Sequence, residues 1–367
     1  MASKVSILSS WTVKAGGSLI EEHPDNCEII ELTPWDVLEL QIDYAQGGLL
    51  YLMPTSQQVS DLSKSTNTSS LIHHLRASLS RALDFFPPFC GRLEAARDHS
   101  GTTSFFINCN NAGVQFIHAI ADGITVRDVL ESNCVPHVVR NFFPLNGLKN
   151  LEATSQPFLA LQVTELKDGI FIGCAVNHAL VDGTSFWHFY GSWAEVSCGS
   201  SIISNIPYLK RQFPFKIDHL CNRISIPNEK LDVGDKFIPQ AVKMLREGVF
   251  HFTKENVAKL KAKANLEMNT TKISYSSSCT TFKVSINMRE RLNPPLPEGF
   301  FGNAIYPCHH NSQDGRAAQA RIGTLQINEM IASHDHEKLK CIYENWMNNP
   351  EVTKLTDLPS NYFMLHN

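Results

Sequence analysis

The stretch GIFIGCAVNHALVDGTSFWHFYGSWAEV, residues 169–196, decides the fold. Its first eight residues, 169–176, are almost all apolar, which predicts a strand buried on both faces. Its last part, residues 184–196, repeats large aromatic side chains at helical spacing and predicts a largely buried helix. Between them lies NHALVDG, residues 177–183. A polar segment therefore joins a buried strand to a packed helix, and this is where we look for chemistry.

His178 and Asp182 are the candidate functional residues of this segment. A histidine at the end of a buried strand is rigidly positioned and can face a cleft, and its ordinary pKa near neutrality suits a general base. Gly183 interrupts the pattern and predicts a sharp turn before the helix. Asp182 leaves two interpretations open. It either orients the imidazole, as in a catalytic triad, or it has a structural role.

Two other histidine patterns have structural interpretations. HxxxD is a weak pattern in a chain with 15 histidines, and a second copy, HAIADG, occupies residues 118–123. No aromatic helix follows this copy, so we expect it to be an ordinary strand and turn. The cluster His334-Asp335-His336 resembles a set of metal ligands. A polar helix start is the favoured interpretation of it, so no metal site is expected.

Length and composition limit the class of protein. A chain of 367 residues predicts about two domains with ordinary cores. The net charge of -4 does not favour nucleic-acid binding. No apolar run is long enough for a membrane helix, and the start of the chain lacks the apolar stretch of a signal peptide. The ten cysteines are scattered without a CxxC pair. We therefore expect a cytoplasmic protein with free thiols.

Further elements follow from local patterns. Residues 69–85 carry leucines at four-residue steps before Pro87 and predict a helix. Residues 197–215 are rich in Gly, Ser and Pro and predict a long connection. Residues 249–253 predict a strand, and Thr253 is a plausible N-cap for the helix after it.

Several stretches, in one order, carry a resemblance to a known family. They are IELTPWD (30–36), FFPPFCGRL (85–93), PFLALQVT (157–164), the HxxxDG run, NMRERLNPPLP (287–297) and FFGNA (300–304). Together they resemble the plant BAHD acyltransferases, enzymes of specialised metabolism that use acyl-CoA thioesters. The matches cover most of the chain and are far more specific than HxxxD alone.

The resemblance implies an α/β fold with mixed sheets, in a two-domain, chloramphenicol-acetyltransferase-like architecture. Residues 1–197 would form the N-terminal domain, 198–218 the crossover linker and 219–367 the C-terminal domain. An acyl group would pass from acyl-CoA, a co-substrate, to a hydroxyl or amine of a small acceptor, with His178 as general base. The resemblance also implies a monomer with no permanently bound cofactor. From the composition and the motifs as well, we expect a cytoplasmic protein with no metal, and with neither nucleic acid nor a membrane as partner.

The same resemblance implies a structural role for the other site residues. Asp182 would turn away from His178 and pair with Arg289, with Arg291 as the alternative, and so clamp the active-site loop to the second domain. Gly183 would permit the turn. Acetyl, malonyl and hydroxycinnamoyl donors all remain open, and so does the choice of an oxygen or nitrogen acceptor.

The chain departs from the family in its second half. No DFGWG motif occurs, and a helix that the family has after residues 272–274 is missing. These departures predict a partial second domain. They keep open a second hypothesis, that the chain is an inactive truncated homologue or an incorrect gene model. A third hypothesis is lyase chemistry in the same cleft.

Overall fold

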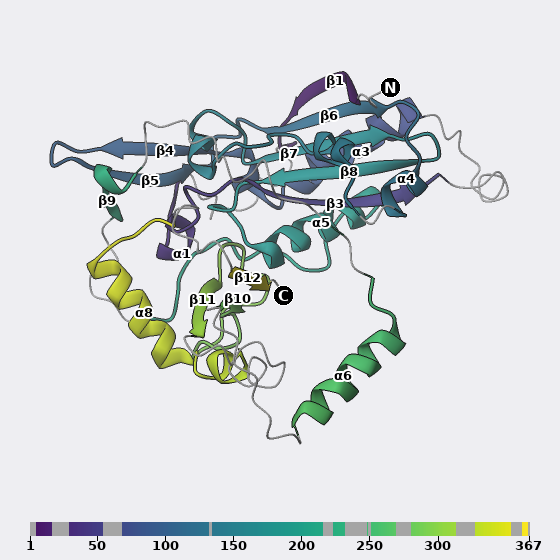
Figure 1. Ribbon diagram of the computed structural model, residues 1–367. Helices are drawn as coiled ribbons and strands as arrows, with labels where there is room; N and C mark the ends of the chain where they lie inside the picture. Colours follow the sequence, from purple (N-terminus) through teal and green to yellow (C-terminus); the bar gives the residue numbers. More distant parts are fainter. Residues whose placement is uncertain are drawn as a thin grey trace.

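The computed structural model describes residues 5–16, 29–53, 68–131, 134–215, 223–231, 248, 251–268, 280–312, 327–353 and 362–365. Helices flank mixed β-sheets, as Figure 1 shows. This is the predicted fold class, which is confirmed.

The first half of the chain contains both strands and helices. The strands are β1 (Val5–Val13), β2 (Ile29–Glu31), β3 (Ala45–Leu52), β4 (Arg92–Arg97), β5 (Thr102–Asn108), β6 (Val114–Ala121), β7 (Leu159–Glu165) and β8 (Gly169–Val176). The helices are α1 (Pro34–Val37), α3 (Thr68–Leu83), α4 (Val126–Leu130) and α5 (Gly183–Ser197), with 3₁₀ turns η1 (Pro87–Cys90), η2 (His137–Phe142) and η3 (Asn150–Thr154).

The second half contributes fewer described elements. They are β9 (Ser225–Pro227), η4 (Asn228–Lys230), α6 (Lys254–Met268), β10 (Thr280–Asn287), β11 (Ile305–Ser312), α8 (His336–Asn348) and β12 (Tyr362–Leu365). Residues 327–332 are also helical.

A five-stranded sheet carries the decisive stretch. Its strand order is β1-β6-β7-β8-β3, with β6 and β7 parallel and the other neighbours antiparallel. All eight residues of β8 are buried, because neighbouring strands flank it and side chains pack on both of its faces. The predicted strand, buried on both faces, is confirmed. It ends at Val176, directly before the polar segment that carries His178.

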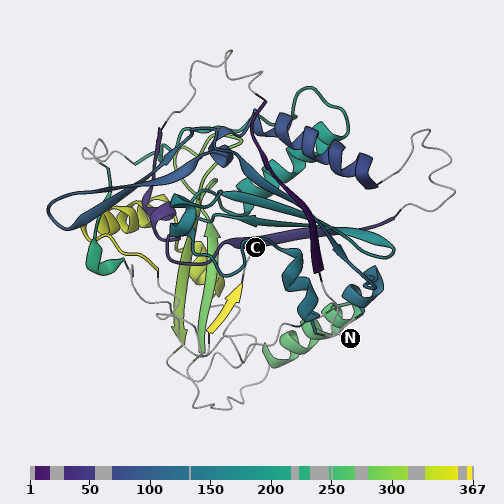
Figure 2. The same ribbon diagram turned by 90° about the horizontal axis from the view of Figure 1, so that it is seen from above.

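Two smaller sheets complete the β-structure. One joins β2, β5 and β4, and β9 pairs with β5 in it, so the chain returns to the first half after its long connection. The other has the order β11-β10-β12. Figure 2 shows this second sheet apart from the five-stranded one. The predicted domain boundaries at 197 and 218 stay a prediction.

The main core lies between the five-stranded sheet and the helices α3 and α5, which run side by side (Figures 1 and 2). Phe86, Phe89 and Phe189 are completely buried there, with ring centroids 4.6–6.4 Å apart. Aromatic contacts of this kind add to the burial of apolar surface. The aromatic spacing of residues 184–196 is therefore mainly a packing pattern, and it fixes α5 against the sheet.

A second core forms where the two halves meet. Trp35 of α1 packs edge-on against Phe213 and against Tyr343 of α8. Leu292 and Phe300, which lie between β10 and β11, complete this core. Residues far apart in the sequence thus share one apolar cluster behind the loop that carries His178.

Some local predictions need correction. Residues 251–253 form no strand; instead Thr253 caps α6, accepting a hydrogen bond from Asn256 N at 3.1 Å. Residues 249–250 lie outside the described part of the chain. Residues 269–279 also lie outside it, so the predicted absence of a family helix after residues 272–274 stays a prediction. Residues 198–215 contain no helix or strand, as the predicted connection requires. None of the helices in the described residues is both long and apolar enough to cross a bilayer.

Candidate active site

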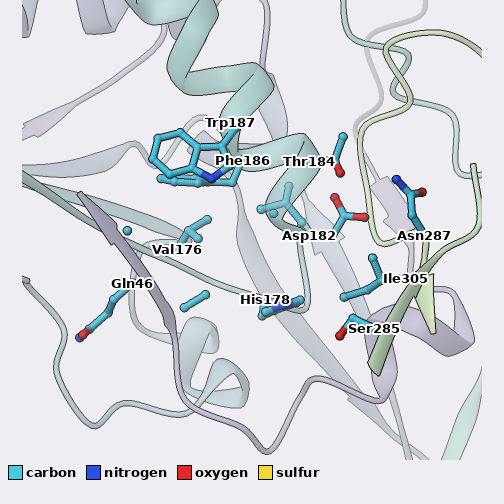
Figure 3. Close-up of a pocket in the computed structure, with 14 residues that line it drawn as sticks. Gln46, Val176, His178, Asp182, Thr184, Phe186, Trp187, Ser285, Asn287 and Ile305 are labelled. Atoms are coloured by element: carbon cyan, nitrogen blue, oxygen red, sulfur yellow. The ribbon is translucent and has the colours of Figure 1, made fainter. Parts of the chain in front are cut away.

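His178 lies on a cavity of about 520 Å³ that both halves of the chain line. The first half contributes Gln46 and Gly47 of β3, the loop after β8, and the start of α5 with Phe186 and Trp187. The second half contributes Ser285, Asn287 and Ile305 from β10 and β11. Figure 3 shows these side chains around His178. The structure therefore places the predicted base where a ligand can reach it.

The backbone of the loop is fixed on both sides of His178. Its N–H donates to Asn150 Oδ1 at 2.8 Å, and its carbonyl accepts from Asn303 Nδ2 at 2.7 Å. Asn177 is fully buried and donates to the Asn150 carbonyl at 2.8 Å. Buried amides that satisfy neighbouring backbone groups stiffen a loop, because breaking them leaves polar groups unpaired.

The imidazole itself is left available for chemistry. Among the described residues, His178 Nδ1 is buried and has no hydrogen-bond partner. The side chain is half-buried and faces the cavity. The ring is thus positioned through its backbone and by packing.

Asp182 does not orient His178. It is the N-cap of α5, and its Oδ1 accepts from Ser185 N at 2.9 Å. Arg289 binds both oxygens, at 2.7 Å and 2.9 Å, and Ala304 N donates to Oδ2 at 3.0 Å. Figure 3 shows the carboxylate directed away from His178. The implied Asp182–Arg289 contact is present, and a triad with His178 is absent.

This ion pair joins the two halves of the chain. The Asp182 side chain is 0% exposed and that of Arg289 14%. Arg289 also donates to Ser185 Oγ at 3.0 Å, and Ser185 Oγ donates to the carbonyl of Gly302 at 3.0 Å. A bidentate arginine–carboxylate pair with further hydrogen bonds is geometrically specific. Arg291, the alternative partner, instead donates to the carbonyl of Ile331 at 2.9 Å.

A second buried ion pair, which the sequence did not suggest, supports the same loop. Arg211 Nη1 lies 2.8 Å from Asp36 Oδ2, with side chains 3% and 1% exposed. Arg211 Nη2 donates to the Leu180 carbonyl. Asp36 lies in the stretch IELTPWD, but Arg211 lies in the polar connection, where nothing in the local pattern distinguishes it from a solvated side chain.

The other histidine patterns have structural partners. His118 of the second HxxxDG copy contacts Glu165 on the neighbouring strand, and Asp122 is exposed. Asp335 caps α8, accepting from Lys338 N at 3.0 Å. His334 and His336 contact different groups: His334 Nε2 lies 3.4 Å from Cys308 Sγ, and His336 Nδ1 accepts from Asn293 N. His118 thus lies in a strand and Asp335 at the start of a helix, as predicted.

The described residues contain no group of three or more His, Cys, Asp or Glu side chains that could bind a metal ion. Cys174, the cysteine nearest the site in sequence, is 0% exposed inside β8. Burial raises the pKa of its thiol, which keeps it protonated and unreactive.

Gly183 does not make the predicted turn. It is the first residue of α5, its φ is not positive, and the turn is made by Asp182 as N-cap. A Cβ built on Gly183 meets no atom within 4 Å. The prediction that this position needs glycine for backbone freedom is therefore wrong.

We expect Gly183→Ala to stabilise the protein. Alanine restricts the unfolded chain and fits the helical backbone here, which raises the free energy of unfolding by about 0.4–1 kcal/mol. Urea denaturation of the purified variant measures this change. A loss of stability would show that the backbone at residue 183 is strained after all. Gly113→Ala is the matched opposite case, because its φ is +94° and Val13 O lies 2.7 Å from the added Cβ.

The fold and the cavity define the class of protein: a two-part α/β chain with an HxxxD histidine at the junction of its parts. A family model described as the transferase family matches residues 55–280. An uncharacterized acetyltransferase of Arabidopsis thaliana is 36% identical over 352 residues, which cover 89% of this chain and 76% of the relative. BAHD acyltransferase DCR of the same plant is 30% identical over 386 residues, 96% of this chain and 77% of the relative.

A solved structure supports the fold independently. The crystal structure of vinorine synthase matches 99% of this chain and 83% of its own, with a TM-score of 0.63 and 17% identity. At this identity the likeness shows the fold alone. The chain belongs to the plant BAHD acyltransferase family.

Proposed function

We propose that this protein transfers an acyl group from acyl-CoA to a hydroxyl or amine of a small acceptor, with His178 as general base. The observation that carries the proposal is the placement of His178 on a cavity lined by both halves, while Asp182 is fully engaged with Arg289. Family membership supports acyl-CoA as the co-substrate. The acceptor is a small molecule of plant specialised metabolism.

The chemistry follows from the imidazole of His178 on this cavity. Nε2 of His178 takes the proton of the acceptor as its oxygen or nitrogen attacks the thioester carbonyl. The tetrahedral intermediate then collapses, the carbon–sulfur bond breaks, and the imidazolium returns its proton to the departing CoA sulfur. General-base catalysis of this kind contributes roughly 10²–10⁴-fold, and binding both substrates in one cavity contributes more. No covalent acyl-enzyme is needed.

The cavity restricts what can bind beside the base. Phe186 and Trp187 form an aromatic wall with ring centroids 5.1 Å apart, and Trp187 is 47% exposed. Gln46, Ser285 and Asn287 supply uncharged polar groups. This mixture suits a small acceptor with one reactive hydroxyl or amine and an otherwise apolar body.

Two other functions remain as alternatives. One is an inactive homologue or an incorrect gene model. Lyase chemistry in the same cavity would use the same histidine as a base. We also propose that the protein acts in the cytoplasm as a monomer.

A thermal melt with and without CoA tests the proposal first. A ligand that binds only the folded state stabilises it by about 2.7 kcal/mol at a hundredfold excess over its Kd. We expect one cooperative transition that CoA shifts upward and that ATP at the same concentration does not. A panel of acetyl-, malonyl- and hydroxycinnamoyl-CoA with small alcohols and amines then identifies the donor. A broad transition without a CoA shift would favour the inactive homologue.

A further inference from the structure

The buried pair formed by Asp36 and Arg211 lies directly behind the loop that carries His178. Neither residue lines the cavity, so neither can contact a substrate there. Removing two charges from water costs several kcal/mol per ion, and a purely apolar replacement would often be at least as stable. Stability alone therefore does not explain a buried ion pair at this place, beside the loop that carries His178.

The pair connects to two carbonyls of the loop. Arg211 Nη1 forms an ion pair with Asp36 without a well-directed hydrogen bond, and Nη2 donates a hydrogen bond to the carbonyl of Leu180. Asp36 Oδ1 accepts from Asn303 Nδ2 at 2.8 Å, and the same nitrogen donates to the carbonyl of His178 at 2.7 Å. The carbonyls of residues 178 and 180 are thus both bound to one charged cluster.

The cluster is itself fixed by its surroundings. Asp36 Oδ2 accepts from Thr33 N and Thr33 Oγ1, both at 2.8 Å, in the capping box of α1. Arg211 comes from the connection between the two halves, and Asn303 from the segment before β11. Three distant segments must therefore assemble before the loop reaches its final geometry.

We propose that Asp36 and Arg211 are positioning residues for His178. This inference rests on the proposed function, in which His178 is the base. The pair orients the peptide planes between residues 178 and 179 and between residues 180 and 181, and these planes set the direction of the imidazole into the cavity. On the other side of the loop, Arg289 binds Asp182, so the loop is held between two buried ion pairs. A base displaced by about 1 Å can cost 10²-fold in rate.

Arg211→Lys tests the proposal without removing the charge. A lysine has one ammonium group and cannot place its charge beside Asp36 and at the same time donate to the Leu180 carbonyl from a rigid planar group. We expect kcat to fall by about 10- to 100-fold, with KM for acyl-CoA changed less than the rate. The matched control is Arg223→Lys, because Arg223 pairs with Glu31 at the surface, with side chains 34% and 51% exposed. This control should leave kcat unchanged.

A second variant and a spectroscopic readout separate positioning from stability. The double variant Asp36→Asn/Arg211→Gln removes both charges together, so no unpaired charge stays buried. NMR of protein labelled with ¹⁵N in its histidine rings gives the ring signals of His178, which are assigned by their loss in His178→Ala. These signals report the surroundings of the ring even if the protein transfers no acyl group. We expect both variants to shift these signals and the Arg223→Lys control to leave them in place.

The outcomes discriminate between the two proposals. Lower melting temperatures with unchanged His178 signals and unchanged kcat would overturn the positioning role and leave the pair purely structural. Shifted signals and a reduced kcat in both variants would support it. If the wild-type protein transfers no acyl group, the proposed function fails, and the His178 signals still decide whether the pair positions the ring.

Discussion

Replacement of His178 by alanine is expected to reduce acyl transfer by about 10²–10⁴-fold, because the acceptor then loses its general base. The fold should survive. The loop is fixed through the backbone N–H and carbonyl of His178, and the ring nitrogen Nδ1 has no partner to lose among the described residues. Steady-state kinetics with the best donor, together with a thermal melt, measure both effects.

The matched control is His99→Ala, which removes an exposed histidine from the turn between β4 and β5. It should change neither activity nor stability. His178→Ala with full activity would eliminate general-base catalysis by this residue. If His178→Ala did not fold, its loss of activity would say nothing about catalysis. His178→Gln, which retains bulk and polarity, is therefore measured in parallel. We expect this variant to stay folded and to lose activity.

Replacement of Asp182 by alanine is expected to lower the free energy of unfolding by about 3–5 kcal/mol, because Arg289 would stay buried without its counter-charge. The Ser185 and Ala304 amides would also lose their acceptor, and α5 its N-cap. A loss of this size is a large part of the total stability of a typical domain. Urea denaturation of the wild type and the variant measures it.

A double-mutant cycle assigns this loss to the pair. Asp182→Ala and Arg289→Met should each destabilise, and the double variant should be less destabilised than their sum, since it leaves no unpaired charge. The surface pair Glu31–Arg223 is the control, and Glu31→Ala should cost less than about 1 kcal/mol. If Asp182→Asn kept the fold but lost activity with a changed pH profile, Asp182 would act on His178 and the structural role would be refuted.

Local patterns predicted the elements around the site well. The apolar run at 169–176 is β8, the aromatic run at 184–196 lies in α5, and the leucine-spaced segment at 69–85 overlaps α3. Burial on both faces produces continuous apolar sequence, and helix packing produces 3.6-residue spacing, so these signals survive without tertiary information. The Asp182–Arg289 contact was reached only through family resemblance, because no rule of spacing links residues 107 positions apart.

The site residues that sequence reasoning missed share one property. Asn150 and Arg211 are polar residues that lie outside the HxxxD motif and bind the backbone of its loop. Polar residues in loops are usually solvated, so nothing in their local sequence marks them as buried. The prediction for Gly183 was wrong for a different reason. Its glycine suggested a turn residue, but Asp182 makes the turn as the N-cap of α5, and Gly183 is the first residue of the helix.

By itself, the sequence determined the buried strand, the aromatic helix and the histidine between them, because hydrophobic periodicity and local backbone chemistry are encoded within a few turns or strand lengths. Only the tertiary structure decided which side chains surround that histidine. The direction of Asp182, the Asp36–Arg211 pair and the cavity shared by both halves depend on contacts between distant segments. Such contacts form when folding buries charged and amide groups, because a buried polar group without a partner costs free energy.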